Sequence, residues 1–183
     1  NLSLSMDAAD IKPSRLERAR YKITDLLQAR KDGQTALVVY AGDAFTVTPL
    51  TDDAETIRAQ LGALNTDIMP VQGSRTERAL AQSAKLLSQA GLRDGHVLLI
   101  SDGANGNEAL QAAKRLYDQG YSLSVLGVGT AQGAPVSVAG SGFLKDDSGA
   151  IVVPKLDSAF LQALVMAGGG RYQPVTNDNS DVQ

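Results

Sequence analysis

The segment 96–103, HVLLISDG, decides which class of fold this sequence predicts. It holds an unbroken apolar run, as in a short strand that is covered on both faces, and Asp102 and Gly103 end the run in a turn. The segments 35–41, TALVVYA, and 122–129, SLSVLGVG, are predicted strands as well. The chain therefore carries several strands of the kind found inside a parallel sheet.

Amphipathic helices separate these strands in the sequence. Leu16, Ala19, Ile23 and Leu26 recur at helical spacing and predict the first helix. Apolar positions predict four more helices, in the segments 54–64, 80–87, 110–116 and 157–164. Strands that alternate with helices predict an α/β fold, with a doubly wound, mostly parallel sheet flanked by helical layers.

Smaller elements complete the predicted domain. An edge strand is expected at 45–50, a hairpin at 143–154 and a last strand at 171–175. Because 183 residues suit one well-cored domain, we expect a single domain over residues 1–176 and a polar, disordered tail at 177–183.

The composition excludes several classes of function. The formal charge is -3 and no long block of Lys or Arg occurs, so no nucleic acid is expected as a partner. The sequence has no cysteine, which excludes disulfides, thiolate nucleophiles and cysteine-based metal sites. No apolar run approaches the roughly 18 residues that cross a bilayer.

Ligand sites of such sheets lie at the carboxyl ends of the strands. Three segments are predicted to meet there, 1–5, 73–74 and 102–103. They supply one amide, three hydroxyls and one carboxylate, from Asn1, Ser3, Ser5, Ser74 and Asp102. Such hard oxygen groups suit a small divalent cation, and no nitrogen or sulfur ligand competes. In an extended segment Ser3 and Ser5 point the same way and could contact one ion.

Three stretches resemble the motifs of the metal ion-dependent adhesion site (MIDAS) of von Willebrand factor A (vWA) domains, whose first motif is DxSxS. They are NLSLSM at 1–6, GSRTERAL at 73–80 and LLISDG at 98–103. The segments DIKPSRLERA (10–19) and GFLKDDSGAIVVPKLD (142–157) are similar in particular to the bacterial membrane-anchored Bat (aerotolerance-type) vWA proteins. The resemblance implies a doubly wound sheet, a bound Mg²⁺ or Mn²⁺, and a protein partner whose acidic side chain completes the coordination of the ion. It does not imply catalysis.

Carried over to this sequence, the resemblance makes Ser3 and Ser5 direct metal ligands, and Asp102 would hold the ion or its bound water. Ser74 replaces the usual Thr of the family and keeps the hydroxyl. Asn1 replaces Asp and removes one negative charge, worth roughly 6 to 7 kcal/mol of attraction to a divalent ion at about 5 Å and an effective dielectric constant near 20. Even about a fifth of that energy changes affinity about tenfold, so a degenerate, weakly binding site is predicted.

A vWA domain carries its first motif at the end of a central strand, and the sequence begins at Asn1. We therefore expect the first central strand to be largely absent from this chain. The missing strand would come from a longer protein or from another copy of the chain. In the second case the chain would form a strand-swapped homo-oligomer, because unpaired strand edges favour association.

Simpler interpretations exist for some of these residues. Ser74 could be the N-cap of a helix, with Glu77 completing a capping box, and this role does not exclude a metal role. Arg15, Arg18 and Arg20 are expected on a hydrated helix face, where they could also meet an acidic partner.

Three functions fit the sequence. The first is a metal-assisted protein-binding module in a membrane-associated assembly, and the second is a vWA scaffold that has lost its metal. The third is a Mg²⁺-dependent phosphoryl-transfer enzyme, which needs a nucleophilic Asp where Asn1 or Ser3 stands. Asn1 and Ser3 are poor replacements for that Asp, so we expect no enzyme activity. His96 has no partner motif for catalysis, so we expect a structural role for it. From the resemblance we expect a soluble domain of a bacterial inner-membrane protein that faces the periplasm.

Overall fold

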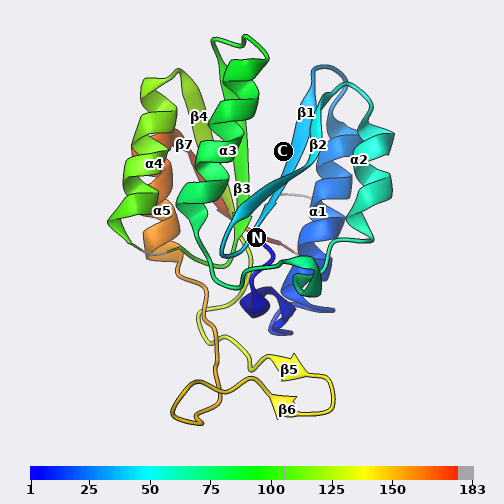
Figure 1. Cartoon of the computed structure of the whole chain (residues 1–183), viewed down its shortest axis with the longest axis vertical. Helices are drawn as coiled ribbons and strands as arrows, with labels where there is room; N and C mark the ends of the chain where they lie inside the picture. The colour runs from blue at the N-terminus through cyan, green and yellow to red at the C-terminus, as the bar shows by residue number, and fades with distance from the viewer. Residues whose placement is uncertain (105, 177–183) are drawn as a thin grey trace.

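The structure is a computed structural model of the chain, and it describes residues 1–104 and 106–176 (Figure 1). The predicted tail at 177–183 lies outside the described residues. The helices are η1 (Leu4–Asp7), α1 (Arg15–Ala29), α2 (Ala54–Leu61), η2 (Thr66–Ile68), α3 (Thr76–Gln89), α4 (Asn107–Asp118) and α5 (Ser158–Gly168). The strands are β1 (Thr35–Tyr40), β2 (Ala44–Thr51), β3 (Gly95–Ser101), β4 (Tyr121–Gly127), β5 (Ser137–Val138), β6 (Gly142–Phe143) and β7 (Gly169–Pro174).

The strands form a parallel sheet and two antiparallel pairs. The parallel sheet has the order β3-β4-β7, with Leu99 opposite Val125 in the first pair. β1 and β2 form an antiparallel hairpin, in which Tyr40 lies opposite Ala44. The short strands β5 and β6 form the other pair. Helices flank the sheets, so the predicted α/β fold is confirmed.

Two hydrophobic clusters hold the layers together. In one, Tyr40 and Leu99 lie among buried residues of α3, α4 and α5. In the other, Val39 is buried with residues of α1 and α2, and Ile100 packs against them. Neighbouring residues of a strand thus serve opposite faces, as the period of two requires. Figure 1 shows α1 and α2 on the side of β1 and β2.

Side-chain caps mark the starts of α1, α2 and α5, but not those of α3 and α4. The side chain of Ser14 accepts a hydrogen bond from Glu17 N at the start of α1, and Asp157 caps α5 as predicted. The alternative role of Ser74 as an N-cap does not hold, because α3 begins at Thr76 and Arg75 occupies the N-cap position without a side-chain cap.

A cleft separates β1 from β3. It has a volume of about 720 Å³ and is lined largely by apolar residues of α1, β1, α3, β3 and β4. At its end Leu2 N donates to Tyr40 O (2.7 Å) and the backbone nitrogen of Asn1 donates to Ile100 O (3.1 Å). Within residues 1–104 and 106–176 no strand bridges β1 and β3.

The cleft changes the expected burial of β1. The sequence predicts that residues 35–41 are covered on both faces, but only Val39, Tyr40 and Ala41 are buried. The segment 35–38 is half-buried, since one edge of β1 faces the cleft.

An extension, residues 131–157, leaves the fold at the carboxyl end of the sheet and projects from it (Figure 1). It carries β5 and β6 and a turn in which Lys145 pairs with Ile151. Asp146 closes this turn by accepting hydrogen bonds from Ser148 and Ala150. The hairpin predicted at 143–154 is thus present as a short turn.

Candidate functional site

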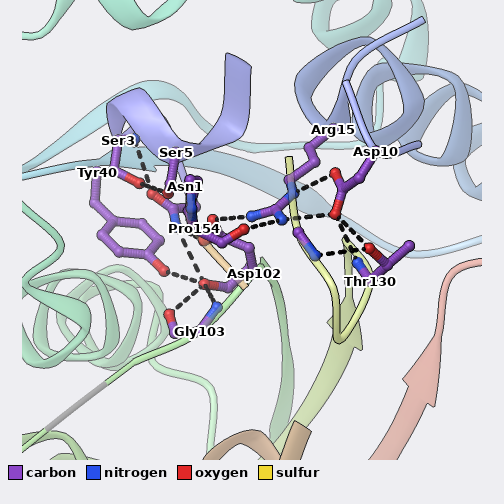
Figure 2. A network of polar contacts seen from close by, with 12 residues as sticks. Asn1, Ser3, Ser5, Asp10, Arg15, Tyr40, Asp102, Gly103, Thr130 and Pro154 are labelled. Atoms are coloured by element: carbon purple, nitrogen blue, oxygen red, sulfur yellow. Dashed lines mark hydrogen bonds and ion pairs between the residues drawn. The ribbon is translucent and has the colours of Figure 1, made fainter. Parts of the chain in front are cut away.

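Asn1 joins the start of the chain to the end of β3. Its Nδ2 donates to Asp102 Oδ1 (2.9 Å) and to Ser101 Oγ (3.1 Å), and its Oδ1 accepts from Ser3 N (2.9 Å) (Figure 2). Three hydrogen bonds therefore fix the orientation of the amide, with its nitrogen toward the carboxylate. An ionised Asp at this position could make neither of the two donor contacts.

The two predicted serine ligands lie together. Ser3 Oγ and Ser5 Oγ are 2.9 Å apart, and either hydroxyl could be the donor. The spacing rule assumed an extended segment, but Ser5 lies in η1, because Met6 N donates to Ser3 O and turns the chain. Ser3 is buried and Ser5 is half-buried. The hydroxyls are thus paired with each other at the rim of the network.

Ser74 lies at the same edge of the sheet but apart from the network. Its loop is fixed to the end of β1 by two backbone bonds, Gly42 N to Val71 O (2.9 Å) and Arg75 N to Ala41 O (2.8 Å). Ser74 itself is exposed. In the part of the chain that the structure describes, no hydrogen bond joins Ser74 to the other four predicted ligands. The structure thus brings together Asn1, Ser3, Ser5 and Asp102.

Arg15, at the start of α1, is the charged site residue that most clearly departs from the sequence prediction. It was expected on a hydrated face, but its side chain is 0% exposed. Its Nη1 donates to Asp102 Oδ2 (2.8 Å), and its Nε and Nη2 donate to the two oxygens of Asp10 (2.8 and 2.7 Å). Nη2 also donates to Pro154 O (2.7 Å), at the base of the extension (Figure 2). A weak signal existed: a cation in the first helical turn opposes the helix dipole.

The charges of this cluster shift the pKa values of its members. Burial alone would raise the pKa of Asp10, but hydrogen bonds from Arg15 and Thr130 lower it to about 2. Burial disfavours the charged form of Arg15, but its contacts with Asp10 and Asp102 raise the pKa of the guanidinium overall. Arg15 is thus a permanent buried cation. Burial raises the pKa of Tyr40 to about 12, although a hydrogen bond to Ser101 opposes this.

Further contacts fix the end of β3. Ser101 Oγ accepts from Tyr40 OH (3.1 Å) and donates to Gly103 O (2.7 Å). The backbone oxygen of Asp102 accepts from Asp157 N (3.0 Å), where the extension returns to the fold. Thr130, which directly precedes the extension, donates to Asp10, and Pro154 and Asp157 at its returning end contact Arg15 and Asp102. The site and the extension therefore form one connected network.

His96 does not belong to this site. It lies near the start of β3, at the opposite end of the strand, and its Nδ1 is 2.6 Å from Ser122 Oγ. Burial lowers the pKa of its imidazole. The structural role expected for His96 agrees with this position.

Among the helices of the described residues, none is long and apolar enough to cross a membrane.

The chain belongs to the von Willebrand factor type A domain family, which matches residues 1–105. It is similar to an aerotolerance-related membrane protein from Bacteroides fragilis, with 34% identity and a TM-score of 0.93 over 99% of this chain and 90% of that chain. It is also similar to BatB from Bacteroides thetaiotaomicron, with 33% identity and a TM-score of 0.92 over 99% and 89%. The predicted family and its Bat-type branch are confirmed.

Curated relatives are similar to the chain over most of its length. A UPF0353 protein from Mycobacterium bovis is 26% identical over 96% of this chain and 54% of its own length. The chain therefore spans about half the length of the curated relatives it matches. Domains of this family generally mediate contacts between proteins.

A vWA domain can bind a metal ion at a MIDAS. Proximal thread matrix protein 1 from mussel byssus, described with a zinc-occupied MIDAS motif, shares the fold at 15% identity and a TM-score of 0.58, over 86% of this chain and 36% of that one. Here the donor set has one carboxylate, Asp102, and both its oxygens already accept hydrogen bonds, from Arg15 and Asn1. The described residues hold no cluster of three His, Cys, Asp or Glu side chains. In this arrangement the residues do not fit a tightly bound divalent cation.

Proposed function

We propose that the chain is a protein-binding module of a membrane-associated assembly in bacteria, with a degenerate MIDAS. The binding surface is the carboxyl-end edge of the sheet, where Asn1, Ser3, Ser5 and Asp102 meet and Ser74 is exposed beside them. The partner offers an acidic side chain to this edge. The parent protein is anchored in the inner membrane with this domain on the periplasmic side.

One observation carries the proposal: segments far apart in the sequence place Asn1, the two hydroxyls and Asp102 in one network at one edge of the sheet. Domains of this family generally mediate contacts between proteins, which supports a binding role for this edge. The similarity to a Bacteroides fragilis protein described as an aerotolerance-related membrane protein supports the membrane-associated setting. The Mg²⁺ or Mn²⁺ expected from the resemblance stays a prediction.

A metal-free scaffold is the second candidate, and the pairing of Asp102 with Arg15 favours it over an enzyme. A scaffold and a binding module differ in one respect, because only the module needs a free surface at this edge. Ser74 supplies that surface, since it is exposed on a loop that β1 holds in place.

Site-directed photocrosslinking in the bacterial host tests the proposal. The native parent protein carries a photoreactive residue at Ser74, or, as the control, at Gln119, which is exposed at the opposite end of the sheet. We expect a discrete crosslinked protein from Ser74 and none from Gln119. Excess purified wild-type domain should compete for this product, and a Ser74→Arg domain should need about tenfold more to compete.

Equal products from both positions would contradict the proposed surface. Equal competition by the wild-type and Ser74→Arg domains would contradict it too, because a bulky side chain at the contact should weaken binding by at least this factor.

A further inference from the structure

We infer that Arg15 and Asn1 take the place of a divalent cation at Asp102, so that this edge binds its partner without a metal ion. The part of the inference that concerns partner binding rests on the proposed function. The part that concerns the metal ion rests only on the hydrogen bonds and ion pairs around Asp102. Arg15 and Asn1 are positioning residues, because they act by fixing the carboxylate of Asp102.

The orientation of the Asn1 amide is the first reason. A MIDAS ion needs oxygen atoms directed at it from the first and third motifs. Here Nδ2 of Asn1, a donor, faces Asp102 Oδ1 at 2.9 Å, and the amide oxygen is engaged by Ser3 N. Rotating the amide to present its oxygen would place that oxygen against the carboxylate and lose all three hydrogen bonds.

The second reason is that the guanidinium of Arg15 is fixed beside Asp102 by several contacts. Its guanidinium is completely buried, and four of its N–H groups are used, on Asp102, Asp10 and Pro154. Asp10 in turn is held by the backbone and the hydroxyl of Thr130. A divalent ion beside Asp102 would stand next to a fixed positive charge, which lowers its affinity.

The charge count is the third reason. Of the five predicted ligands, Asn1 and the three serines are neutral and only Asp102 carries a charge. That charge forms a 2.8 Å ion pair with Arg15. Mg²⁺ and Mn²⁺ bind proteins through carboxylates. Among the five predicted ligands the single carboxylate, that of Asp102, is already neutralised by its ion pair with Arg15. The guanidinium and the amide thus supply the positive partners that a bound ion supplies elsewhere.

Mn²⁺ titration of the wild-type chain, followed by ¹H–¹⁵N NMR, tests the inference without a substitution. Mn²⁺ broadens signals of nearby protons, so the side-chain NH₂ of Asn1 and the Nε–H of Arg15 report on the site. We expect no selective broadening of these signals up to about 1 mM Mn²⁺. This concentration half-saturates a site whose binding free energy is about 4 kcal/mol. Selective broadening of these signals at about 1 mM Mn²⁺ or below would overturn the inference.

The Asn1→Asp variant provides the complementary test, with Asn1→Ala as its control. A carboxylate at position 1 would repel Asp102, so the melting temperature of Asn1→Asp should rise with Mn²⁺ and its Mn²⁺ affinity should exceed that of the wild type by about tenfold or more. Asn1→Ala removes the amide and adds no charge, and should gain no such affinity. Equal affinities of the Asn1→Asp and wild-type chains would contradict the role given to Asn1.

Crosslinking from Ser74 is repeated in membranes that contain either EDTA or Mg²⁺. The two buffers test metal independence separately from the proposed binding surface. Equal yields in both buffers are expected. A product that forms only with Mg²⁺ would overturn metal independence and keep the binding surface. The absence of a product in both buffers would overturn the binding surface, and the NMR titration would still decide the role of Arg15 and Asn1.

Discussion

The two halves of the candidate site differ in how fully their polar groups are paired. In the inner half Asp10, Arg15 and Asp102 are almost completely buried, and ion pairs of 2.7 and 2.8 Å join them. In the outer half Ser5 is half-buried and Ser74 is exposed. We therefore expect the inner half to stabilise the fold, and the exposed Ser74 to be accessible to the proposed partner.

Replacing Arg15 should have the largest effect on the inner half. Arg15→Met leaves Asp10 and Asp102 buried without their cation, so the free energy of unfolding should fall by about 3 to 5 kcal/mol. The matched control is Arg58→Met, because Arg58 pairs with Glu55 on an exposed face and should lose at most about 1 kcal/mol. Urea denaturation measures both, and equal losses would show that burial of the Arg15 pairs contributes nothing.

Asp10→Asn should have the next largest effect, and the effect should depend on pH. At neutral pH the loss should be about 1.5 to 3 kcal/mol, as for hydrogen bonds to charged groups. The folded-state pKa of Asp10, about 2, lies below its ordinary value of 3.8, so its stabilisation is present above pH 4. It should disappear as the pH falls from about 4 to 2. A stability difference between wild type and Asp10→Asn that stays constant from pH 6 to about 2 would refute this pairing.

Asn1→Ala should have a smaller effect, because it removes a neutral amide and leaves Asp102 paired with Arg15. We expect a loss of about 1 to 2 kcal/mol, from two donated bonds and one accepted bond. Asn65→Ala is the matched control, since Asn65 is exposed and makes one long contact of 3.4 Å to Ala63 O. Thermal unfolding compares the two variants, and similar melting temperatures would argue against the role of the amide.

Ser74→Ala should change stability least, because its side chain is exposed. The change should stay within about 0.5 kcal/mol, as it should for Ser88→Ala at an exposed position of α3. The variants should separate in partner binding, where only Ser74→Ala should reduce competition in the crosslinking assay. A loss of stability above about 1 kcal/mol for Ser74→Ala would place Ser74 in the inner half of the site.

Much of this architecture follows from local patterns. Apolar runs and helical spacing predict the α/β fold, and the rule for the carboxyl ends of parallel strands brings Asn1 and Ser3 to Asp102. The start of α3 shows where a short sequence motif fails to predict structure. A Ser three residues before Glu77 satisfies the sequence rule, but the backbone bond from Arg75 N to Ala41 O sets where α3 begins.

The role of Arg15 could not follow from local patterns. Its partner Asp102 is 87 residues away, and helical spacing cannot show which face of the first turn meets a carboxylate across the fold. Helical spacing therefore assigned Arg15 to the hydrated face, together with Arg18 and Arg20. The resemblance to a metal-binding family likewise indicated where ligands gather, but the electrostatics at Asp102 depend on this non-local contact.

The melting temperature of the wild-type chain in about 5 mM Mg²⁺ or Mn²⁺, compared with EDTA, tests the central claim most directly. A site with a Kd of about 50 μM would be stabilised by about 2.7 kcal/mol under these conditions, which raises the melting temperature by about 5 to 10 °C for a chain of this size. With Arg15 and Asn1 holding Asp102, we predict a change of less than about 1 °C. A rise of about 5 °C or more with either ion would contradict the claim.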